Sequence, residues 1–451
     1  MTNPANNSQS LIVGENVLPD HLDEQHAGGD AFHDLAPTIA DEKLERARPI
    51  PRITIAAFCE QPVTAQAVQA ASEDRRLAKV HVSVHMGGVY AAIAHFQEHP
   101  SPNLVILESM LDRGSMLAAL DQLAEHCDSG TQVIVVGHSN DVLLYRELLR
   151  RGVSEYLVAP VSPIALMEGI SNLYNDPEAS PIGTVVAFVG AKGGVGSSTV
   201  CHNTAWVMSR ILQANTVIAD LDLPFGTAGL DFNQDPPQGI HDALGSPERL
   251  DEVLLDRLLA KCSDHLSLFG APSVLDRNYE IDPQAFDWVI DVVRQNVPHV
   301  ALDVPHIWTP WTKSVLLQAD EIVITAMPDL ANLRNAKNLV DIIKTNRKND
   351  REPHLVMNFM GMPKRPEISI KEFGEALGLV PRVAMEFDGE TFGTAANNGQ
   401  MIEELAAKSK AAEHFRTLAY ALTKRSEPKK TEQKSLLAPL LARFNKMKGG
   451  A

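Results

Sequence analysis

The segment "TVVAFVGAKGGVGSSTVCHNTAWVMSRIL", residues 184–212, decides the fold of the larger part of this chain. It opens with an apolar run typical of a buried strand and ends with a run that has helical spacing. Between them lie Gly193, Gly194 and Gly196, which lack a Cβ and let the backbone approach a bound group. A strand, a glycine-rich turn and a helix N-terminus together favour an anion, because backbone N–H groups and the helix dipole face it. The segment therefore predicts a phosphate-binding loop in an α/β domain.

This loop departs from the usual pattern G-x-x-x-x-G-K-[ST] at one position. Ser197 stands where a lysine follows the last glycine, and a different lysine, Lys192, opens the run. Ser198 occupies the position whose hydroxyl reaches Mg²⁺. The missing ammonium group would hold the phosphates and stabilise charge as the terminal phosphoryl group leaves. We therefore expect nucleotide binding to survive in weakened form and hydrolysis to be slow or absent.

Polar side chains follow three further strand-like runs. "VIADLD" ends in Asp220 and Asp222, "VALDVP" contains Asp303, and "LVMNF" contains Asn358. Ligands of open parallel sheets bind outside the carboxyl ends of the strands, so these side chains should converge on the loop. We assign Asp303 to the carboxylate beside Mg²⁺, Asp222 to orientation of an attacking water, and Asn358 to a purine edge. Each aspartate alone is more often a turn or cap residue, but the four features occur in the expected order.

The 451 residues are too many for one ordinary core and indicate two folded domains with tails. Strand-like runs alternate with helical ones in two stretches, which predicts two doubly wound parallel-sheet α/β domains. The expected parts are a disordered acidic tail (1–50), a first domain (52–175), a linker (176–183), a P-loop domain (184–425) and a basic tail (426–451).

Charge and composition narrow the class of function. The net charge is −17, with nine acids and three bases in residues 1–50 and eight bases and two acids in residues 424–451. An acidic body weighs against DNA binding, which depends on Lys and Arg. No apolar run is long enough to span a bilayer. The four cysteines are scattered, which favours reduced thiols in a cytoplasm over disulfides or a metal site.

The loop and its partners resemble the deviant Walker A ATPases, the MinD/ParA family, whose loop reads K-G-G-x-G-K-[ST]-[ST]. The resemblance covers residues 183–425 and places Lys192 at that family's signature lysine. "DLDLPFGTAGLDFN" and "FGTAANNGQMIEELAAKSKAAEHF", behind a receiver-like domain, resemble the CpaE/TadZ branch, which helps to place and assemble Flp (tight-adherence) pili.

This resemblance implies ATP, Mg²⁺, a homodimer and pilus secretion or assembly proteins as partners. It implies a cytoplasmic protein, with peripheral contact at the inner membrane or the cell pole as a further expectation. Lys192 would reach phosphates within one chain or across a dimer. Lys192 and Asp222 are the expected catalytic residues, and Asp222 would orient the attacking water. The expected nucleotide contacts are Gly193, Gly194, Val195, Gly196, Ser197, Ser198, Thr199 and Asn358, with Ser198 and Asp303 at the metal.

Residues 52–175 resemble a response-regulator receiver, a flavodoxin-like (βα)₅ unit. A working receiver needs an aspartate after its third strand, where this chain has Glu108. Gly137 stands at or near the position of the required hydroxyl, and Ala159 replaces the lysine before a proline. Phosphoryl transfer to this domain should therefore fail. Glu108 either imitates a permanently charged state or marks a lost switch, and we interpret the domain as a docking or dimerising module.

Residues 434–450, "KSLLAPLLARFNKMKGG", combine leucines with lysines and an arginine at spacings that fit an amphipathic helix. Such a helix can lie on an anionic membrane surface. A solvated basic tail and a helix that docks on a partner protein are the alternatives.

Three functions follow from these features. The first is an ATP-binding, dimerising localisation and assembly factor whose dimer state matters more than turnover. The second is an actively cycling ATPase switch, which Ser197 argues against. The third is a ParA-like DNA segregation protein, which the acidic charge and the receiver-like domain fit poorly.

Overall fold

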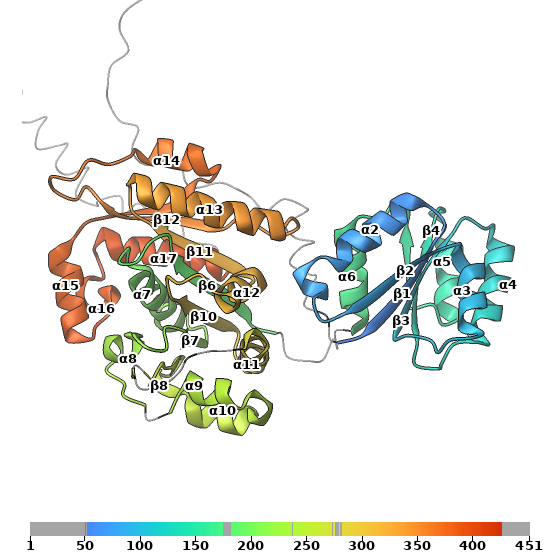
Figure 1. Ribbon diagram of the computed structural model, residues 1–451, viewed down its shortest axis with the longest axis horizontal. Helices are drawn as coiled ribbons and strands as arrows, with labels where there is room; N and C mark the ends of the chain where they lie inside the picture. Colours follow the sequence, from blue (N-terminus) through green and yellow to red (C-terminus); the bar gives the residue numbers. More distant parts are fainter. Residues whose placement is uncertain are drawn as a thin grey trace, which may run out of the picture. The chain divides into compact units, whose positions relative to one another are not determined.

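The computed structural model describes residues 50, 52–174, 182–236, 238–272, 274–275, 279 and 282–425. Apart from Ile50, the expected acidic tail lies outside the described residues, and so does the whole basic tail of residues 426–451. The described residues form two α/β domains, each built on its own sheet (Figure 1). None of the helices in this part of the chain is long and apolar enough to cross a membrane.

The N-terminal domain has a five-stranded parallel sheet in the order β2-β1-β3-β4-β5. This order is that of flavodoxin-like folds, as the sequence predicts. The central strand β3 is buried along its whole length, because helices cover both faces of a parallel sheet. The strands are β1 (Thr54–Cys59), β2 (His81–Met86), β3 (Leu104–Ser109), β4 (Gln132–Gly137) and β5 (Glu155–Val158).

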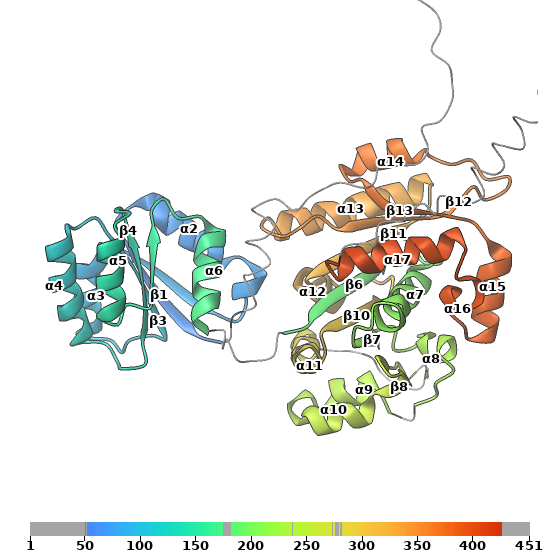
Figure 2. The ribbon, with the colours of Figure 1, turned by 180° about the vertical axis from the view of Figure 1, so that it is seen from behind.

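Helices lie on both faces of this sheet, with α2 and α6 on one and α3, α4 and α5 on the other (Figures 1 and 2). Ile50 is also buried in the core beneath α2 and α6. The domain therefore starts earlier than residue 52, where the sequence analysis placed it. The helices are α2 (Pro62–Ser72), α3 (Gly88–Phe96), α4 (Arg113–Ala124), α5 (Val142–Arg150) and α6 (Pro163–Tyr174), with a short 3₁₀ turn η1 (Arg75–Leu77).

The C-terminal domain has an eight-stranded sheet in the order β13-β12-β11-β6-β10-β7-β9-β8. The strand that feeds the glycine-rich loop, β6, lies between β11 and β10 near the middle. The strands are β6 (Thr184–Gly190), β7 (Thr216–Asp220), β8 (Ala260–Ser263), β9 (Leu266–Phe269), β10 (His299–Val304), β11 (Glu321–Ala326), β12 (His354–Met360) and β13 (Pro381–Glu386).

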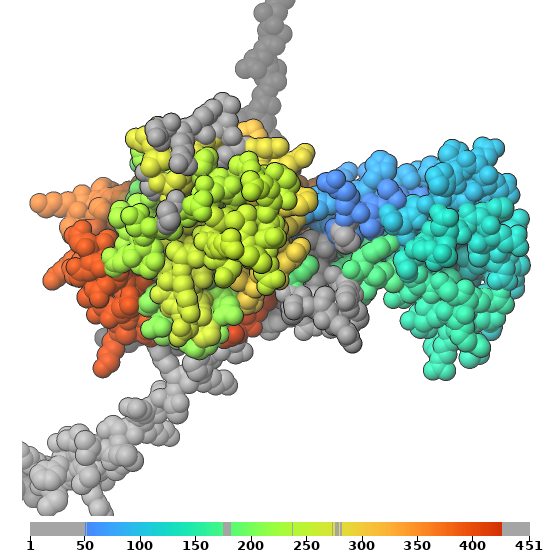
Figure 3. All heavy atoms as spheres, turned by 90° about the horizontal axis from the view of Figure 1, so that it is seen from below, coloured from blue at the N-terminus to red at the C-terminus, as the bar shows by residue number. Residues whose placement is uncertain are grey.

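Two helical layers cover this sheet and bury a separate core on each face. One layer includes α7 (Ser197–Arg210) and α17 (Lys410–Leu422), with α8 (Ala228–Asp231), α15 (Gly389–Asn398) and α16 (Ile402–Ala406) beside them (Figure 2). The other includes α11 (Pro283–Asn296), α12 (Pro310–Gln318), α13 (Leu330–Asn346) and α14 (Ile370–Leu377). Residues of α9 (Ile240–Gly245), η2 (Pro247–Arg249) and α10 (Glu252–Leu258) gather on the face of this domain shown in lime and yellow in Figure 3.

The edge of this sheet differs from the all-parallel arrangement that we expected. β8 pairs with β9 in the antiparallel sense, whereas the other neighbouring strands are parallel. Only Asp264 and His265 join the two strands, and so short a connection permits a hairpin but no crossover. The segment "DEVLLDRLLAKC", residues 251–262, has apolar residues at helical spacing, but its helix ends at Leu258 and residues from Ala260 on form β8.

Candidate functional site

The glycine-rich loop lies between β6 and α7 and has the backbone that a phosphate cradle requires. Gly194 and Gly196 have φ of +79° and +83°, a region that residues with a Cβ rarely adopt. No heavy atom lies within 4 Å of the place where a Cβ of Gly194 would be. At Gly196 a Cβ would lie 2.7 Å from Nδ2 of Asn358. The glycines therefore let the loop turn and leave room beside it for a bound group.

Helix α7 starts directly after this loop, and its first turn contains the exceptional serine. The hydroxyl oxygen of Ser197 is buried and has no hydrogen-bond partner among the described residues. A buried hydroxyl without a partner is costly, so an acceptor supplied from outside the protein would satisfy it. The structure thus places at position 197 a neutral donor instead of a charge, next to the free N–H groups of a helix N-terminus. This arrangement fits a phosphate oxygen.

Lys192 is exposed at the opening of the loop, and its ammonium lies near the carboxylate of Asp329. Burial disfavours the ionised form of Asp329, but hydrogen bonds from Asn332 and the charges of Arg365 and Lys192 outweigh it and lower its pKa. No carboxylate in the described part of the chain lies within ion-pair distance of Lys192. The lysine is therefore available for a further anion.

Three side chains hold the carbonyl groups of the loop. Nδ2 of Asn358 donates to the carbonyl oxygen of Val195 at 2.9 Å, and Nδ2 of Asn335 donates to that of Ala191 at 3.0 Å. Nδ1 of His306 lies 2.9 Å from the carbonyl oxygen of Gly190, which can only accept, so Nδ1 carries the proton. These bonds turn the carbonyls outward, which leaves the amide side of the loop for an anion.

The amide of Asn358 is engaged on both sides, because its Oδ1 also accepts the backbone N–H of Phe359 at 2.9 Å. Contact with a purine would require it to exchange one of these bonds, and its role at a purine edge stays a prediction. Thr199 accepts a hydrogen bond at its backbone carbonyl from Asn203, 2.9 Å away.

The expected metal residues lie together. The hydroxyl of Ser198 donates to Oδ1 of Asp303 at 3.2 Å, at the buried end of β10. A hydroxyl and a carboxylate oxygen at this separation belong to the set of hard oxygen donors that Mg²⁺ prefers. The residues present therefore fit Mg²⁺, and the assignment of Ser198 and Asp303 to such an ion stays a prediction.

A buried histidine, which the sequence analysis did not single out, joins this group. His202 of α7 is fully buried, with Nδ1 2.7 Å from Oδ2 of Asp231 and Nε2 3.3 Å from Oδ2 of Asp303. Burial disfavours a charged ring, but the hydrogen bond that the ring donates to Asp231 and its attraction to the carboxylates of Asp231 and Asp303 outweigh burial and raise the pKa of His202 to about 10. The imidazolium therefore faces Oδ2 of Asp303, whereas the hydroxyl of Ser198 bonds to Oδ1.

The two aspartates after β7 have different surroundings. Asp220 is buried and accepts the backbone N–H groups of Asp222 and Ala228, so it shapes the loop that follows the strand. Burial, followed by repulsion from Asp303, raises the pKa of Asp220. Asp222 is partly exposed, and burial raises its pKa as well. The structure thus places Asp222 on the accessible side of the cluster, where the assigned role in orienting water stays a prediction.

Glu108 of the N-terminal domain is fully buried and saturated by donors of its own chain. Its Oε2 accepts the backbone N–H groups of Glu60 and Gln61 at 2.8 and 2.7 Å. Its Oε1 accepts the hydroxyl of Thr64 at 2.7 Å and lies 3.1 Å from Nε2 of His138. Burial alone would raise the pKa of Glu108, but these hydrogen bonds outweigh it and lower the pKa. This carboxylate stabilises the loop after β1 and leaves no oxygen without a partner.

Tyr156 fills the space beside Gly137, at the end of β4. A Cβ on Gly137 would lie 2.2 Å from the hydroxyl oxygen of Tyr156, so no larger residue fits without moving this ring. The hydroxyl itself donates to the carbonyl oxygen of Ser139 at 2.6 Å. The tyrosine is thus held in the interior by both packing and a hydrogen bond.

The structure therefore brings the predicted loop residues, Asp220, Asp222, Asp303 and Asn358 to the carboxyl end of one sheet. Sequence reasoning missed His202, His306 and Asn335. Only the position of His202, on the buried face of a helix that follows a phosphate loop, offered a signal, because a buried histidine needs a partner.

In comparisons with known proteins, no family model matches the chain. No curated protein matches it either. Among solved structures, the pilus assembly protein CpaE from Caulobacter crescentus is 46% identical over 29% of this chain and 98% of its own, in the N-terminal part, with a TM-score of 0.28.

Two solved ATPases align with about half of the chain. A ParA family ATPase from Chlorobium tepidum is 24% identical over 52% of this chain and 98% of its own, with a TM-score of 0.48. The septum site-determining protein MinD from Pyrococcus horikoshii, which was solved with Mg-ADP, is 18% identical over 54% of this chain and 96% of its own, with a TM-score of 0.47.

The identity with the Caulobacter protein extends over nearly its whole length. It confirms the resemblance drawn from the sequence, and this chain belongs to the family of CpaE-like pilus assembly proteins.

Proposed function

We propose that this protein is an ATP- and Mg²⁺-binding, dimerising localisation and assembly factor for Flp (tight-adherence) pili, with slow or absent ATP hydrolysis. The observation that carries the proposal is the loop of residues 190–196, in which Gly194 and Gly196 have positive φ. The loop is followed by the buried hydroxyl of Ser197, which has no hydrogen-bond partner among the residues that the structure describes. A loop of this kind keeps its main-chain donors for a triphosphate and lacks one of the charges that speed its hydrolysis.

Each group at the site has an assigned task. The N–H groups of residues 193–199 bind the phosphates, and the hydroxyl of Ser197 donates to one of their oxygens. Ser198 and Asp303 hold Mg²⁺, which would neutralise phosphate charge when bound. Lys192 approaches the phosphates within the chain or from the second subunit, and Asp222 orients water. A homodimer is part of the proposal because the resemblance to the MinD/ParA family implies it.

The N-terminal domain acts as a docking or dimerising module without a phosphorylation switch. Its support is the carboxylate of Glu108, which four donors of the same chain surround. The pilus machinery as partner rests on the name of the Caulobacter relative, a pilus assembly protein. Peripheral contact with the inner membrane through residues 434–450, which lie outside the described residues, and placement at the cell pole complete the proposal.

Titration with a fluorescent ATP analogue and Mg²⁺, run beside an assay of phosphate release, tests the nucleotide part. We expect saturable binding with little or no phosphate release. Rapid release would favour an actively cycling ATPase, and the absence of any binding at millimolar ATP would refute the proposal. Imaging of the tagged protein in cells with and without the pilus secretion genes tests the cellular part, because uniform fluorescence in both would contradict a positioning role.

A further inference from the structure

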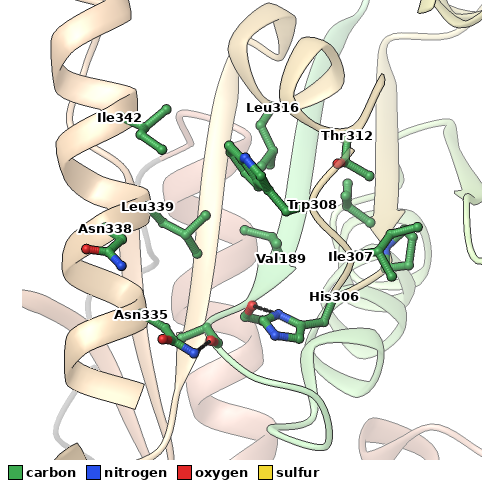
Figure 4. Close-up of a pocket in the computed structure, with 14 residues that line it drawn as sticks. Val189, His306, Ile307, Trp308, Thr312, Leu316, Asn335, Asn338, Leu339 and Ile342 are labelled. Carbon is green, nitrogen blue, oxygen red and sulfur yellow. Dashed lines mark hydrogen bonds between the residues drawn. The ribbon is translucent and has the colours of Figure 1, made fainter. Parts of the chain in front are cut away.

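An apolar cavity of about 300 Å³ lies on the far side of the loop from the metal residues. Its walls come from the first half of the loop, the segment after β10, α12 and α13 (Figure 4). No Lys, Arg, Asp or Glu of the described residues lines it. A volume of this size is at the lower end of that of ligand pockets and suffices for one bulky apolar side chain.

Two large apolar side chains at this cavity are about half exposed. Ile307 and Trp308 are 51% and 52% exposed, although both line the cavity. Half-exposed tryptophans next to an apolar hollow are typical of surfaces that bind another protein, because Trp combines a large apolar area with few rotatable bonds. The cavity therefore has the character of an anchor site.

Basic side chains flank this cavity on two helices. Lys313 lies on the same face of α12 as the lining residue Leu316, three residues further on, and Nη2 of Arg334 donates to Oδ1 of the lining residue Asn335 at 3.2 Å. Both are exposed, and neither has an ion-pair partner in the described ranges. On a chain with a net charge of −17, a basic border around an apolar cavity indicates an acidic ligand.

A small molecule that filled the cavity would not reach these basic groups, because they stand outside its lining. A polypeptide segment with one bulky apolar residue and carboxylates on either side would reach both. We propose that this cavity docks an acidic, amphipathic segment of a partner protein, whose apolar residue enters beside Trp308 and whose carboxylates pair with Lys313 and Arg334.

The cavity lies next to the proposed nucleotide site, and two of its lining residues also hold the phosphate loop. His306 and Asn335 line the cavity and also bind the carbonyl oxygens of Gly190 and Ala191 (Figure 4). A segment bound in the cavity would therefore touch the groups that hold the loop. The docking itself does not depend on the proposed function, and its test uses nucleotide-free protein.

The probe is a fluorescein-labelled peptide of about 14 residues, with one tryptophan and glutamates three and four residues to either side of it. Its binding to the full-length protein is followed by fluorescence anisotropy. We expect a dissociation constant on the order of 10 µM. Trp308→Ala should weaken binding about tenfold, whereas Trp288→Ala should change it less than about twofold. Trp288 is a matched control because it is 53% exposed and lies on α11, away from the cavity.

Charge variants of Lys313 and Arg334 test the contribution of these two basic side chains, and both residues are exposed, so the core is not changed. Lys313→Glu and Arg334→Glu should each weaken binding about fivefold at ~50 mM salt and less at ~300 mM, because salt screens exposed charges. Lys371→Glu on α14 is the control, since that exposed lysine is not near the cavity lining. A peptide of this chain's own residues 434–450 is basic and should not bind.

Four results would overturn the proposal. These are the absence of saturable binding, equal effects of Trp308→Ala and Trp288→Ala, binding of the basic peptide as tightly as the acidic one, and insensitivity to both charge variants. A second copy of this chain is the other possible occupant of the cavity. Sedimentation of the wild type and of Trp308→Ala tests this by measuring self-association. Loss of self-association with unchanged peptide binding would assign the cavity to that copy and refute the proposal.

Discussion

Nδ1 of His202 lies 2.7 Å from Oδ2 of Asp231, and this pair joins α7, the helix after the phosphate loop, to the short helix α8. Its other nitrogen faces Asp303 at 3.3 Å, so one cation lies between a partly exposed carboxylate and a buried one. His202→Gln would leave both carboxylates without it, and we expect a loss of about 3 kcal/mol in the free energy of unfolding. Urea unfolding of the full chain followed by circular dichroism measures the loss.

His265→Gln is the matched control for this prediction. Its Nδ1 lies 2.6 Å from Oδ1 of Asn215, a neutral partner on an exposed part of the domain. This change should cost less than about 0.5 kcal/mol. If both variants lost a similarly small free energy of unfolding, a positive charge on His202 would not contribute to stability.

Restoration of a lysine at the loop tests the cause of slow hydrolysis. Ser197→Lys should bring an ammonium to the phosphates and raise the rate of phosphate release at least about tenfold. Ser139→Lys, in the other domain, adds the same charge away from the site and should leave the rate unchanged. An unchanged rate in Ser197→Lys would show that the missing lysine is not what limits turnover.

Alanine variants of two glycines with similar φ angles distinguish backbone strain from a loss of nucleotide binding. Gly194 and Gly152 have φ of +79° and +95°, and no atom lies within 4 Å of a Cβ built on either. Alanine at each should cost about 1 kcal/mol of stability for the same conformational reason. Only Gly194→Ala should weaken binding of the ATP analogue, by about tenfold or more, because its Cβ would enter the proposed phosphate site. Equal affinities of the two variants would exclude this loop as the binding site.

The buried carboxylate of Glu108 can be tested by local hydrogen exchange. Glu108→Gln removes the charge, so the carboxylate oxygen that accepts from the N–H groups of Glu60 and Gln61 is replaced at best by the neutral oxygen of an amide, a weaker acceptor. We expect their exchange with deuterium to become at least about tenfold faster, a change of about 1.4 kcal/mol in local stability. Glu125→Gln at the exposed end of α4 should not change it. Unchanged protection at residues 60 and 61 would show that these donors do not depend on the charge of Glu108.

His299 predicts a pH dependence of stability. Burial, followed by the charge of Arg425, lowers the pKa of His299 from its ordinary value near 6.5 to about 4. Between these two values the unfolded chain binds a proton at His299 that the folded chain does not. Stability should therefore fall as the pH decreases from 6.5 towards 4. The part due to His299 should reach roughly 1 kcal/mol at pH 5, allowing for its partial exposure.

Urea unfolding at pH 7 and pH 5 measures this effect in the wild type and in His299→Gln. The variant should lose less stability than the wild type between the two pH values, since it carries no proton there. An equal loss in both would assign the acid sensitivity to other groups.

The sequence predicted much of the fold because parallel strands between helices are apolar along their length. The runs that end in Asp220, Asp303 and Asn358 became β7, β10 and β12, and the common edge of their carboxyl ends brought these side chains together. β2, "HVSVHM", was not identified, because this edge strand alternates polar and apolar residues and forms no continuous apolar run. β8 is hard to identify from the sequence, because leucines at helical spacing directly precede it.

The site was harder to predict where contacts depend on long-range packing. The bond from Asn335 to Ala191 spans 144 positions, and nothing near Asn335 in the sequence indicates it. The same holds for the bond between Asn358 and Val195, which gives the expected ligand residue a second role as a support of the loop. Residue types and strand ends identify a site, but its internal supports become visible only in three dimensions.

The ring of Tyr156 limits which side chains the N-terminal domain can accept at position 137. A Cβ on Gly137 would lie 2.2 Å from the phenol oxygen, so a serine or threonine there would collide with the ring. Aspartate at position 108 together with a hydroxyl residue at position 137 would therefore not suffice to turn this domain into a phosphate acceptor. A smaller residue in place of Tyr156 would also be needed, and that replacement alone would leave a void in the interior and lower the stability of the domain.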